Sequence, residues 1–274
     1  MALLSYKAPT TTIVIPARYG STRLPGKPLL DIMGKTLLQR VCEVAMTAAK
    51  QLEGVSVVVA TDDKRIIDHV MSLNINVAVI TTPTNCTTGT DRIYAAITQL
   101  DVKPQYVINL QGDAPLTPVS IIIDLIQALK QHPIVTPAMQ LRWEELDQLR
   151  AAKENHPFSG TSVVMNTSNE ALWFSKQIIP AIRDEAELRS KNVLSPVYQH
   201  LGIYGYSFKM LEIFHKLKTG YYEKLEGLEQ LRLLEHGYKI TIVPVHLDNL
   251  LAWRGVDTLA DAEFVAKILS GEPQ

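Results

Sequence analysis

The sequence has only two cysteines among 274 residues, and its formal net charge is −1. Cys42 and Cys86 have neither the spacing of metal ligands nor the number that a disulfide framework needs. This excludes a cysteine-based zinc module and a disulfide-stapled fold, and it favours a reducing setting, the cytoplasm. The near-zero charge excludes a global field that would attract nucleic acid or an anionic membrane. Any preference for an anionic ligand must therefore come from a local group of cations.

Long apolar runs are also missing. No run approaches the roughly 18 residues that a membrane-spanning helix needs, so we expect no membrane insertion. Residues 1–10 lack the basic start and apolar core of a signal peptide, and we interpret them as a short N-terminal extension. Apolar residues make up 46% and charged residues 20% of the chain, a composition typical of a globular protein. Cys42 falls in an apolar helical pattern and is expected in the core.

Apolar strands alternate with amphipathic helices in the first half. Periodicity predicts strands at 11–16, 55–62, 75–81 and 105–115, and helices at 35–50, 63–74, 89–100 and 118–132. Continuous apolar strands separated by helices indicate a parallel sheet with helices on both faces. The sequence therefore predicts an α/β fold.

The second half is less regular. Residues 161–176 read as two strands around a polar turn, and 200–207 as one alternating strand. Residues 224–245 read as a helix, a Gly stop and a strand, and 258–270 as a closing helix. The stretch 183–197 is the most polar and is expected to be the most flexible. No internal repeat or linker divides the chain, so we predict one domain over 11–274.

The stretch "RYGSTRLPGKPL" (18–29) looks like a phosphate-binding P-loop but departs from that pattern. Five residues separate Gly20 from Gly26, where the pattern has four, and Lys27 is followed by Pro rather than Ser or Thr. The proline also predicts that no helix begins on Lys27. What remains is a bent loop with three cations, Arg18, Arg23 and Lys27, which suits a polyanion such as a triphosphate. A solvated basic loop without a ligand is the alternative interpretation.

Acidic residues follow the ends of predicted strands. In open α/β sheets ligands bind beyond the carboxyl ends of the strands, so Arg18, Asp62 and Asp113 are expected on one rim. Asp113, in "NLQGDAP", suits Mg²⁺ beside a phosphate chain, although an Asp that caps a turn explains this motif equally well. Asp257, before the closing helix, is a second candidate, with a simple helix cap as the alternative. "TTGTDR" (87–92) gives a weak phosphate or ribose signal through a helix start and Arg92.

Together, these motifs resemble one family. "IPARYGSTRLPGKPL", "ATDD", "TGTDR", "NLQGDAP", "HLGIYGY", "LEQLR" and "GVDT" occur in this order between about residues 11 and 265. The set resembles the 3-deoxy-manno-octulosonate cytidylyltransferases, or CMP-Kdo synthetases. The resemblance implies a nucleotide-diphospho-sugar-transferase-like fold with a mixed, mostly parallel sheet. It also implies a cytoplasmic homodimer that depends on magnesium and joins CTP to a 3-deoxy sugar acid for lipopolysaccharide synthesis.

The resemblance assigns site residues by motif. It implies a nucleotide-binding half at about 11–150, a sugar-binding and dimerisation half at about 151–257, and the closing helix after it. Arg18, Lys27, Asp113 and Asp257 would be catalytic, with Asp113 and Asp257 holding Mg²⁺. The nucleotide would be bound by Arg18, Arg23, Lys27, Thr88, Gly89, Arg92, Gln111 and Asp113. The sugar acid would be contacted by Arg183, His200, Tyr204, Glu229 and Gln230. Charge neutralisation and positioning would carry the reaction, without a protein nucleophile.

Three positions depart from the family pattern. The family has Glu where this chain has Ala114, Lys where it has Ser162, and Arg where it has Lys176. Because two of these lie in the half expected to bind the sugar, an amino-substituted Kdo is an alternative substrate. A sialic-type acid is another, although the Pro-Gly-Lys-Pro ending of the first loop argues against it. A non-catalytic nucleotide-binding homologue is a third, which the joint presence of Lys27, Asp113 and Asp257 disfavours.

Overall fold

The computed structural model describes residues 9–20, 24–246 and 255–271. Ten strands of these residues form one mixed sheet in the order β5-β4-β1-β6-β11-β7-β10-β8-β9, with β12 paired to β7. The strands are β1 Thr11–Pro16, β4 Val55–Thr61, β5 Ala78–Thr81, β6 Tyr106–Asn109, β7 Ile134–Arg142, β8 Ser162–Met165, β9 Ala171–Ser175, β10 Leu194–His200, β11 Tyr204–Ser207 and β12 Thr241–Val245. A small separate hairpin joins β2 Asp31–Ile32 to β3 Lys35–Thr36.

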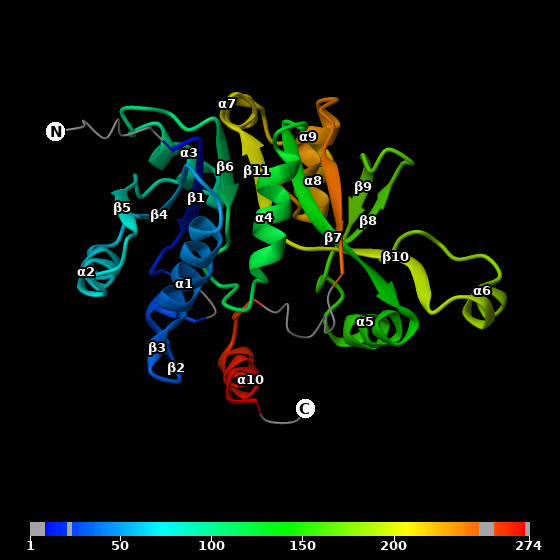
Figure 1. Cartoon of the computed structure of the whole chain (residues 1–274). Coiled ribbons are helices and arrows are strands. Elements are labelled where there is room, and N and C mark those ends of the chain that lie inside the picture. The colour runs from blue at the N-terminus through cyan, green and yellow to red at the C-terminus, as the bar shows by residue number, and fades with distance from the viewer. Residues whose placement is uncertain (1–8, 21–23, 247–254, 272–274) are drawn as a thin grey trace.

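Helices cover both faces of this sheet (Figure 1). They are α1 Leu37–Lys50, α2 Lys64–Ser72, α3 Gly89–Ile97, α4 Val119–Ala128, α5 Trp143–Asn155, α6 Glu185–Lys191, α7 Phe208–Lys216, α8 Tyr221–Glu226, α9 Leu231–Glu235 and α10 Leu259–Ser270. None of the helices in the described part of the chain is both long enough and apolar enough to span a membrane.

Strand β1 contributes side chains to the apolar clusters on both faces of the sheet. Its side chains point to opposite faces of the sheet. Ile13 and Ile15 pack in the apolar cluster that contains α1 and α4, whereas Val14 packs in the cluster that contains α3 and α7. Cys42 is fully buried in the first cluster, as predicted. Because β1 is apolar on both faces, it occupies the middle of the parallel part of the sheet.

The parallel part agrees with the sequence prediction. β1 pairs in parallel with β4 and β6, and β4 pairs in parallel with β5. α1 begins at Thr36, whose hydroxyl accepts a hydrogen bond from the Gln39 backbone N–H at 3.1 Å, a typical N-cap. The carboxyl ends of β1 and β6 therefore lie side by side.

Four predictions about local structure were wrong or incomplete. β7 and α5 form a strand and a helix at 134–155, where no element was predicted. The strand expected at 200–207 is the end of β10, a turn, and β11. The helix expected from 224 is divided into α8 and α9, because Gly227 has a φ of +64° and ends α8. A single 3₁₀ turn covers Lys27–Leu29, so a helical turn does begin on that lysine although no α-helix does.

Candidate active site

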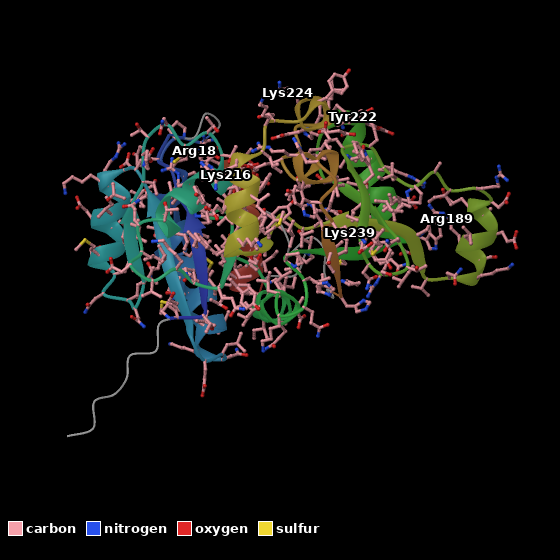
Figure 2. All side chains as sticks on the ribbon, turned by 90° about the horizontal axis from the view of Figure 1, so that it is seen from above. Arg18, Arg189, Lys216, Tyr222, Lys224 and Lys239 are labelled. Atoms are coloured by element: carbon pink, nitrogen blue, oxygen red, sulfur yellow. The ribbon has the colours of Figure 1, made fainter. Side chains whose placement is uncertain are left out.

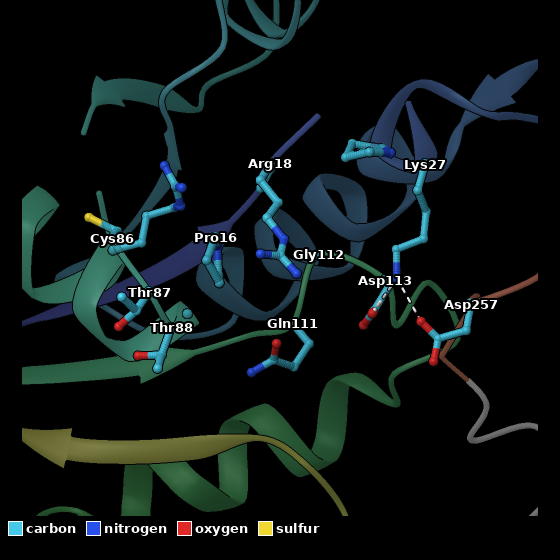
Figure 3. A pocket seen from close by; sticks show the side chains of 14 residues that line it. Pro16, Arg18, Lys27, Cys86, Thr87, Thr88, Gln111, Gly112, Asp113 and Asp257 are labelled. Carbon is cyan, nitrogen blue, oxygen red and sulfur yellow. Dashed lines mark hydrogen bonds and ion pairs between the residues drawn. The ribbon is translucent and has the colours of Figure 1, made fainter. Parts of the chain in front are cut away.

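A cavity of about 380 Å³ opens at the carboxyl ends of β1 and β6 (Figure 3). Segments from five parts of the chain line it: the end of β1, the turn at Lys27, the start of α3, the turn after β6, and Asp257. Eight residues predicted for the nucleotide or for catalysis line this cavity: Arg18, Lys27, Thr88, Gly89, Arg92, Gln111, Asp113 and Asp257. The structure brings these eight residues together at one cavity, and their roles stay predictions. Arg23 lies outside the described residues.

Gly112 allows the two central strands to end in contact. A Cβ at this position would lie 2.7 Å from the carbonyl oxygen of Pro16, the last residue of β1. No side chain fits so close to a backbone oxygen, so glycine is required by this close approach. Gln111 and Asp113 are thereby brought beside Ala17 and Arg18 at the cavity wall.

The segment before α10 supplies the distant carboxylate. The backbone N–H of the fully buried Val256 donates to the carbonyl oxygen of Asp113 at 2.8 Å. This bond places the neighbouring Asp257 beside the turn after β6. The cap of α10 then fixes the direction of the chain, because the Thr258 hydroxyl accepts from the Asp261 N–H at 3.2 Å and Asp261 returns a capping-box bond. Residues from the middle and the end of the sequence thus meet at one point.

Lys27 joins the two carboxylates. Its Nζ donates to Oδ2 of Asp113 at 2.7 Å and to Oδ1 of Asp257 at 3.0 Å. Burial lowers the pKa of the ammonium, but the charges and hydrogen bonds of the two carboxylates outweigh burial, so the pKa is raised above its usual value. Lys27 is therefore a firmly charged cation at neutral pH. Arg18 is exposed and points into the same cavity (Figure 3).

The turn at Gly26 sets the direction of Lys27. Gly26 has a φ of +74°, in the left-handed region that favours glycine. Its N–H donates to the carbonyl of Tyr19 at 3.0 Å, and the 3₁₀ turn that begins on Lys27 buries Pro28. The Gly-Lys-Pro sequence therefore bends the chain back so that the lysine reaches the rim of the sheet.

The start of α3 forms the other wall. Thr88 caps the helix by accepting from the N–H of Asp91 at 3.0 Å. Thr88 and Thr90 also donate their hydroxyls to the two carboxylate oxygens of Glu229, each at 2.9 Å. Burial raises the pKa of Glu229, although both hydroxyl bonds oppose the shift. Glu229 therefore connects the cavity wall to the α8–α9 turn.

Arg92 is held rigidly behind this wall. It is 4% exposed, and its guanidinium donates to Thr82 Oγ1 at 2.6 Å and to Asp62 Oδ2 at 3.1 Å. Asp62 follows β4, so the rim that the sequence predicts for Asp62, Arg18 and Asp113 is confirmed. The carboxylate fixes a guanidinium that faces the cavity.

The residues predicted for the sugar acid lie beyond the lining of this cavity. His200 bonds through Nε2 to Thr136 Oγ1 at 2.8 Å, and its ring is 5.3 Å from that of Tyr204. Burial, with a smaller contribution from Lys176, lowers the pKa of His200 to about 3, so the ring is neutral. Gln230 is 6% exposed, and its Nε2 has no hydrogen-bond partner within the described residues.

Arg183 is exposed in the segment that leads to α6. Ion pairs tie α6 to α5: Arg189 contacts Asp147 at 2.6 Å and Arg150 contacts Glu185 at 2.8 Å. Figure 2 shows Arg18 and Arg189 toward opposite ends of the molecule. The stretch 183–197, expected to be flexible, contains α6 and the first part of β10. The role of Arg183 stays a prediction.

The three residues that depart from the family pattern lie in different parts of the structure. Ala114 is buried beside the Asp113 turn. Ser162 is 1% exposed, and its Oγ lacks a hydrogen-bond partner in the described ranges. Lys176 donates its Nζ to Thr161 Oγ1 at 3.1 Å. An ammonium thus reaches the residue next to Ser162 from the neighbouring strand.

Sequence reasoning missed part of the lining, namely Pro16, Ala17, Pro28, Cys86, Thr87 and Gly112. Most of these residues contribute small or backbone groups, which carry no recognisable chemistry in a sequence. Cys86 and Thr87 had one usable signal, because they follow predicted strand 75–81 and precede the helix start at Gly89.

The sheet, with a cation-lined cavity at the ends of its central parallel strands, defines an α/β nucleotide-binding fold. A family model described as "Cytidylyltransferase" matches residues 12–240. The chain therefore belongs to the cytidylyltransferase family, and it is a nucleotidyltransferase.

Individual relatives and solved structures that are similar to this chain carry more specific names than the family. A 3-deoxy-manno-octulosonate cytidylyltransferase of Maricaulis maris is 42% identical over 263 residues, covering 94% of this chain and 96% of the relative. An 8-amino-3,8-dideoxy-manno-octulosonate cytidylyltransferase of Shewanella sediminis is 43% identical over 239 residues, covering 87% of this chain and 91% of the relative. The structure of a CMP:2-keto-3-deoxy-manno-octonic acid synthetase complexed with CTP has a TM-score of 0.80 and 35% identity, covering 95% of this chain and 98% of that chain. A 4-diphosphocytidyl-2C-methyl-D-erythritol synthase of Anaerococcus prevotii, 14% identical with a TM-score of 0.57, shares the fold.

Proposed function

We propose that this protein joins CTP to 3-deoxy-manno-octulosonate (Kdo) and releases pyrophosphate. The observation that carries the proposal is the convergence of Asp113, Asp257 and Lys27 in a cavity whose walls also present Arg18 and Arg92. Relatives named for this reaction support it, as does the similar structure complexed with CTP.

The reaction requires attack by the anomeric hydroxyl of the sugar acid on the α-phosphorus of CTP. The new bond joins that oxygen to phosphorus, the bond to the β-phosphate oxygen breaks, and the hydroxyl proton is lost to solvent or to the departing pyrophosphate. The phosphate charge repels an anionic nucleophile, so the site must neutralise charge and align the reactants. We assign the triphosphate to Arg18, Lys27 and the amide groups at the start of α3, with Arg23 as a further contact from the loop.

The base and ribose of CTP would lie toward the cavity wall formed by Gln111 and the start of α3. Gln111 is partly buried, and its Nε2 donates to Asn109 Oδ1 at 3.1 Å, which fixes the orientation of the amide. The amide oxygen can accept from the cytosine amino group, which is a donor on the edge of the base. Thr88, Gly89 and Arg92 would line the path between the base and the phosphates.

We propose Mg²⁺ as the cofactor, held by Asp113 and Asp257. The donor set fits: two carboxylates converge on a single cationic group, and no cluster of three or more His, Cys, Asp or Glu within the described ranges offers an all-protein metal cage. Mg²⁺ prefers this arrangement of few carboxylates completed by water and phosphate oxygens. When bound, the ion would neutralise phosphate charge at the reacting centre.

The sugar acid would occupy the region of Glu229, Gln230, His200 and Tyr204, with Arg183 as a further contact. The neutral ring of His200 and the Nε2 of Gln230, which has no partner within the described residues, suit hydroxyl groups rather than a strong charge. An amino-substituted Kdo is a second candidate, because the relatives from Shewanella are named for it and because Ser162 and Lys176 depart from the family pattern.

We also propose a cytoplasmic homodimer in lipopolysaccharide synthesis. Both cysteines are free thiols in the structure, which is consistent with a reducing compartment. Residues at about 151–257 would form the sugar-binding and dimerisation half, and residues at about 11–150 the nucleotide-binding half of a single domain.

A pyrophosphate-release assay tests the substrate assignment. CTP, UTP and ATP are each paired with Kdo, 8-amino-Kdo and a sialic acid under identical conditions. We expect CTP with Kdo to give the highest kcat/KM, and ATP to fall by a factor of a hundred or more because an unmatched base edge leaves buried polar groups unpaired. Higher kcat/KM with 8-amino-Kdo selects the second candidate, and comparable turnover with ATP contradicts the nucleotide assignment.

A further inference from the structure

Lys27 occupies the position between the two carboxylates proposed to hold the metal ion. Its Nζ contacts one oxygen of Asp113 at 2.7 Å and one oxygen of Asp257 at 3.0 Å. The side chain of Lys27 is 15% exposed, against 32% and 40% for the two carboxylates. Lys27 is therefore more deeply buried than either carboxylate, and its ammonium bridges the two, as the dashed lines in Figure 3 mark.

The ammonium of Lys27 neutralises the repulsion between the two carboxylates, as a bound divalent cation would. Two neighbouring carboxylates repel each other, and one cation between them removes most of that repulsion. A divalent ion bonded to the same oxygens would lie against the ammonium, and the two positive charges would repel each other strongly in this partly buried site. At these two oxygens, Asp113 Oδ2 and Asp257 Oδ1, the carboxylates can therefore hold one of the two cations at short range, but not both.

The backbone of Lys27 is fixed, so only its side chain can move. The Lys27 N–H donates to the Leu24 carbonyl at 3.1 Å, and the Lys27 carbonyl accepts from Leu30 at 3.1 Å. Pro28 is buried in the same turn. The flexible four-carbon stem of lysine can swing without disturbing this turn, and the cavity that Lys27 lines gives it space.

We propose that Lys27 is an internal counter-cation that keeps a divalent cation off Asp113 and Asp257 until a nucleotide arrives. The phosphate chain then offers the ammonium a new anionic partner through charge-assisted hydrogen bonds. The carboxylates are released at that moment, and they accept the divalent ion that accompanies the nucleotide. This rests on the proposed function for the identity of the nucleotide, but not for the competition between the two cations. It predicts that metal and nucleotide bind together, and that the metal binds poorly alone.

Binding of Mn²⁺ to the nucleotide-free protein tests the competition. Free Mn²⁺ is measured by electron paramagnetic resonance during titration of the wild type, of Lys27→Met and of Lys64→Met. Lys64 provides the matched control, because it also pairs with a carboxylate, Asp68 at 2.8 Å, on the exposed surface of α2. We expect Lys27→Met to bind Mn²⁺ at least tenfold more tightly than the wild type, which corresponds to about 1.4 kcal/mol. We expect Lys64→Met to bind it as the wild type does.

Two further measurements test whether the gain in Mn²⁺ affinity depends on Asp113 and on bound nucleotide. Adding Asp113→Asn to Lys27→Met should abolish the gain, because the metal then loses one of its two carboxylates. A CTP analogue with a methylene group between its α- and β-phosphates should increase the Mn²⁺ affinity of the wild type strongly, and that of Lys27→Met less.

Unchanged Mn²⁺ affinity in a folded Lys27→Met protein, checked by circular dichroism and repeated with Lys27→Gln, would overturn the proposal. Because the first comparison contains no nucleotide, it stays informative if CTP proves to be the wrong substrate. Failure of the CTP analogue alone, with the tenfold gain present, would instead count against the proposed function.

Discussion

Replacing Gly112 by alanine tests whether contact between the ends of β1 and β6 builds the site. The new Cβ would lie 2.7 Å from the Pro16 carbonyl oxygen and 3.5 Å from Cγ2 of Ile15. A contact of 2.7 Å is too short for carbon and oxygen, and the oxygen belongs to the backbone of Pro16, which is held in register with Ala60 of β4. The ends of the two strands must therefore move apart.

The size of the effect follows from this displacement. Forcing a methyl group into a packed position costs about 1–3 kcal/mol, and in a domain of this size each kcal/mol lowers Tm by roughly 2–4 °C. Activity should suffer more, because the displaced segments carry Arg18 and Asp113. A misplacement of about 1 Å can cost a hundredfold in rate, so we expect kcat with CTP to fall at least tenfold.

Gly20→Ala is the matched control. Among the described residues, a Cβ on Gly20 meets nothing within 4 Å, and this glycine is not among those with a positive φ. Its Tm and fold should match the wild type. Differential scanning calorimetry and steady-state kinetics on both variants provide the comparison. Our account of the rim is refuted if Gly112→Ala keeps the Tm and kcat of the wild type.

Three other predictions follow from the geometry. Asp113→Asn and Asp257→Asn should each lower kcat at least a hundredfold with little change in Tm, and excess Mg²⁺ should rescue them only partly, because the carboxylates position the ion as well as attract it; near-normal kcat in either variant contradicts the assignment. Burial lowers the pKa of His200 to about 3, below the value of about 6.5 in an unfolded chain, so the unfolded state binds the extra proton and stability falls as pH decreases from 6.5 toward 3. Urea unfolding should show that His200→Gln reduces the loss of stability between pH 7 and pH 4.5 by on the order of 2 kcal/mol, and equal losses in both proteins would count against a neutral ring. Light scattering at micromolar concentration should give the mass of a homodimer, and a monomeric mass argues against the proposed assembly.

The first half of the fold follows from local patterns. β1, β4 and β6 are short apolar runs, and the helices between them have clear apolar stripes, so each element is specified by its own residues. The rim of the sheet follows in turn, because carboxyl ends of parallel strands meet at one edge. This is why Arg18, Asp62 and Asp113 were placed together correctly.

The second half depends on partners distant in sequence. β7 contains Pro137 and ends in polar residues, yet it pairs with β10, β11 and β12. Proline is unusual inside a sheet because it has no N–H to donate, so the sequence did not indicate a strand there. The division between α8 and α9 depends on the left-handed conformation of Gly227, which a helical pattern of apolar residues does not reveal.

Only part of the candidate site could be predicted from the sequence. Charged residues after strands were visible in the sequence, whereas the meeting of Asp113 with Asp257 came only from the family resemblance. The structure explains it through the Val256 N–H bond to the Asp113 carbonyl, a backbone contact that no side-chain pattern encodes. The bonds of Thr88 and Thr90 to Glu229 were equally invisible, because they join residues 139 and 141 positions apart.

The most direct test of the central claim is the identity of the product. The protein is incubated with CTP, Kdo and Mg²⁺, and the mixture is followed by ³¹P nuclear magnetic resonance. We predict a new phosphodiester signal from CMP linked to the anomeric oxygen of the sugar, growing with one pyrophosphate for each phosphodiester formed. Signals of CTP that stay unchanged in the presence of Kdo and of 8-amino-Kdo, or pyrophosphate that forms without a phosphodiester, would contradict cytidylyl transfer to a 3-deoxy sugar acid.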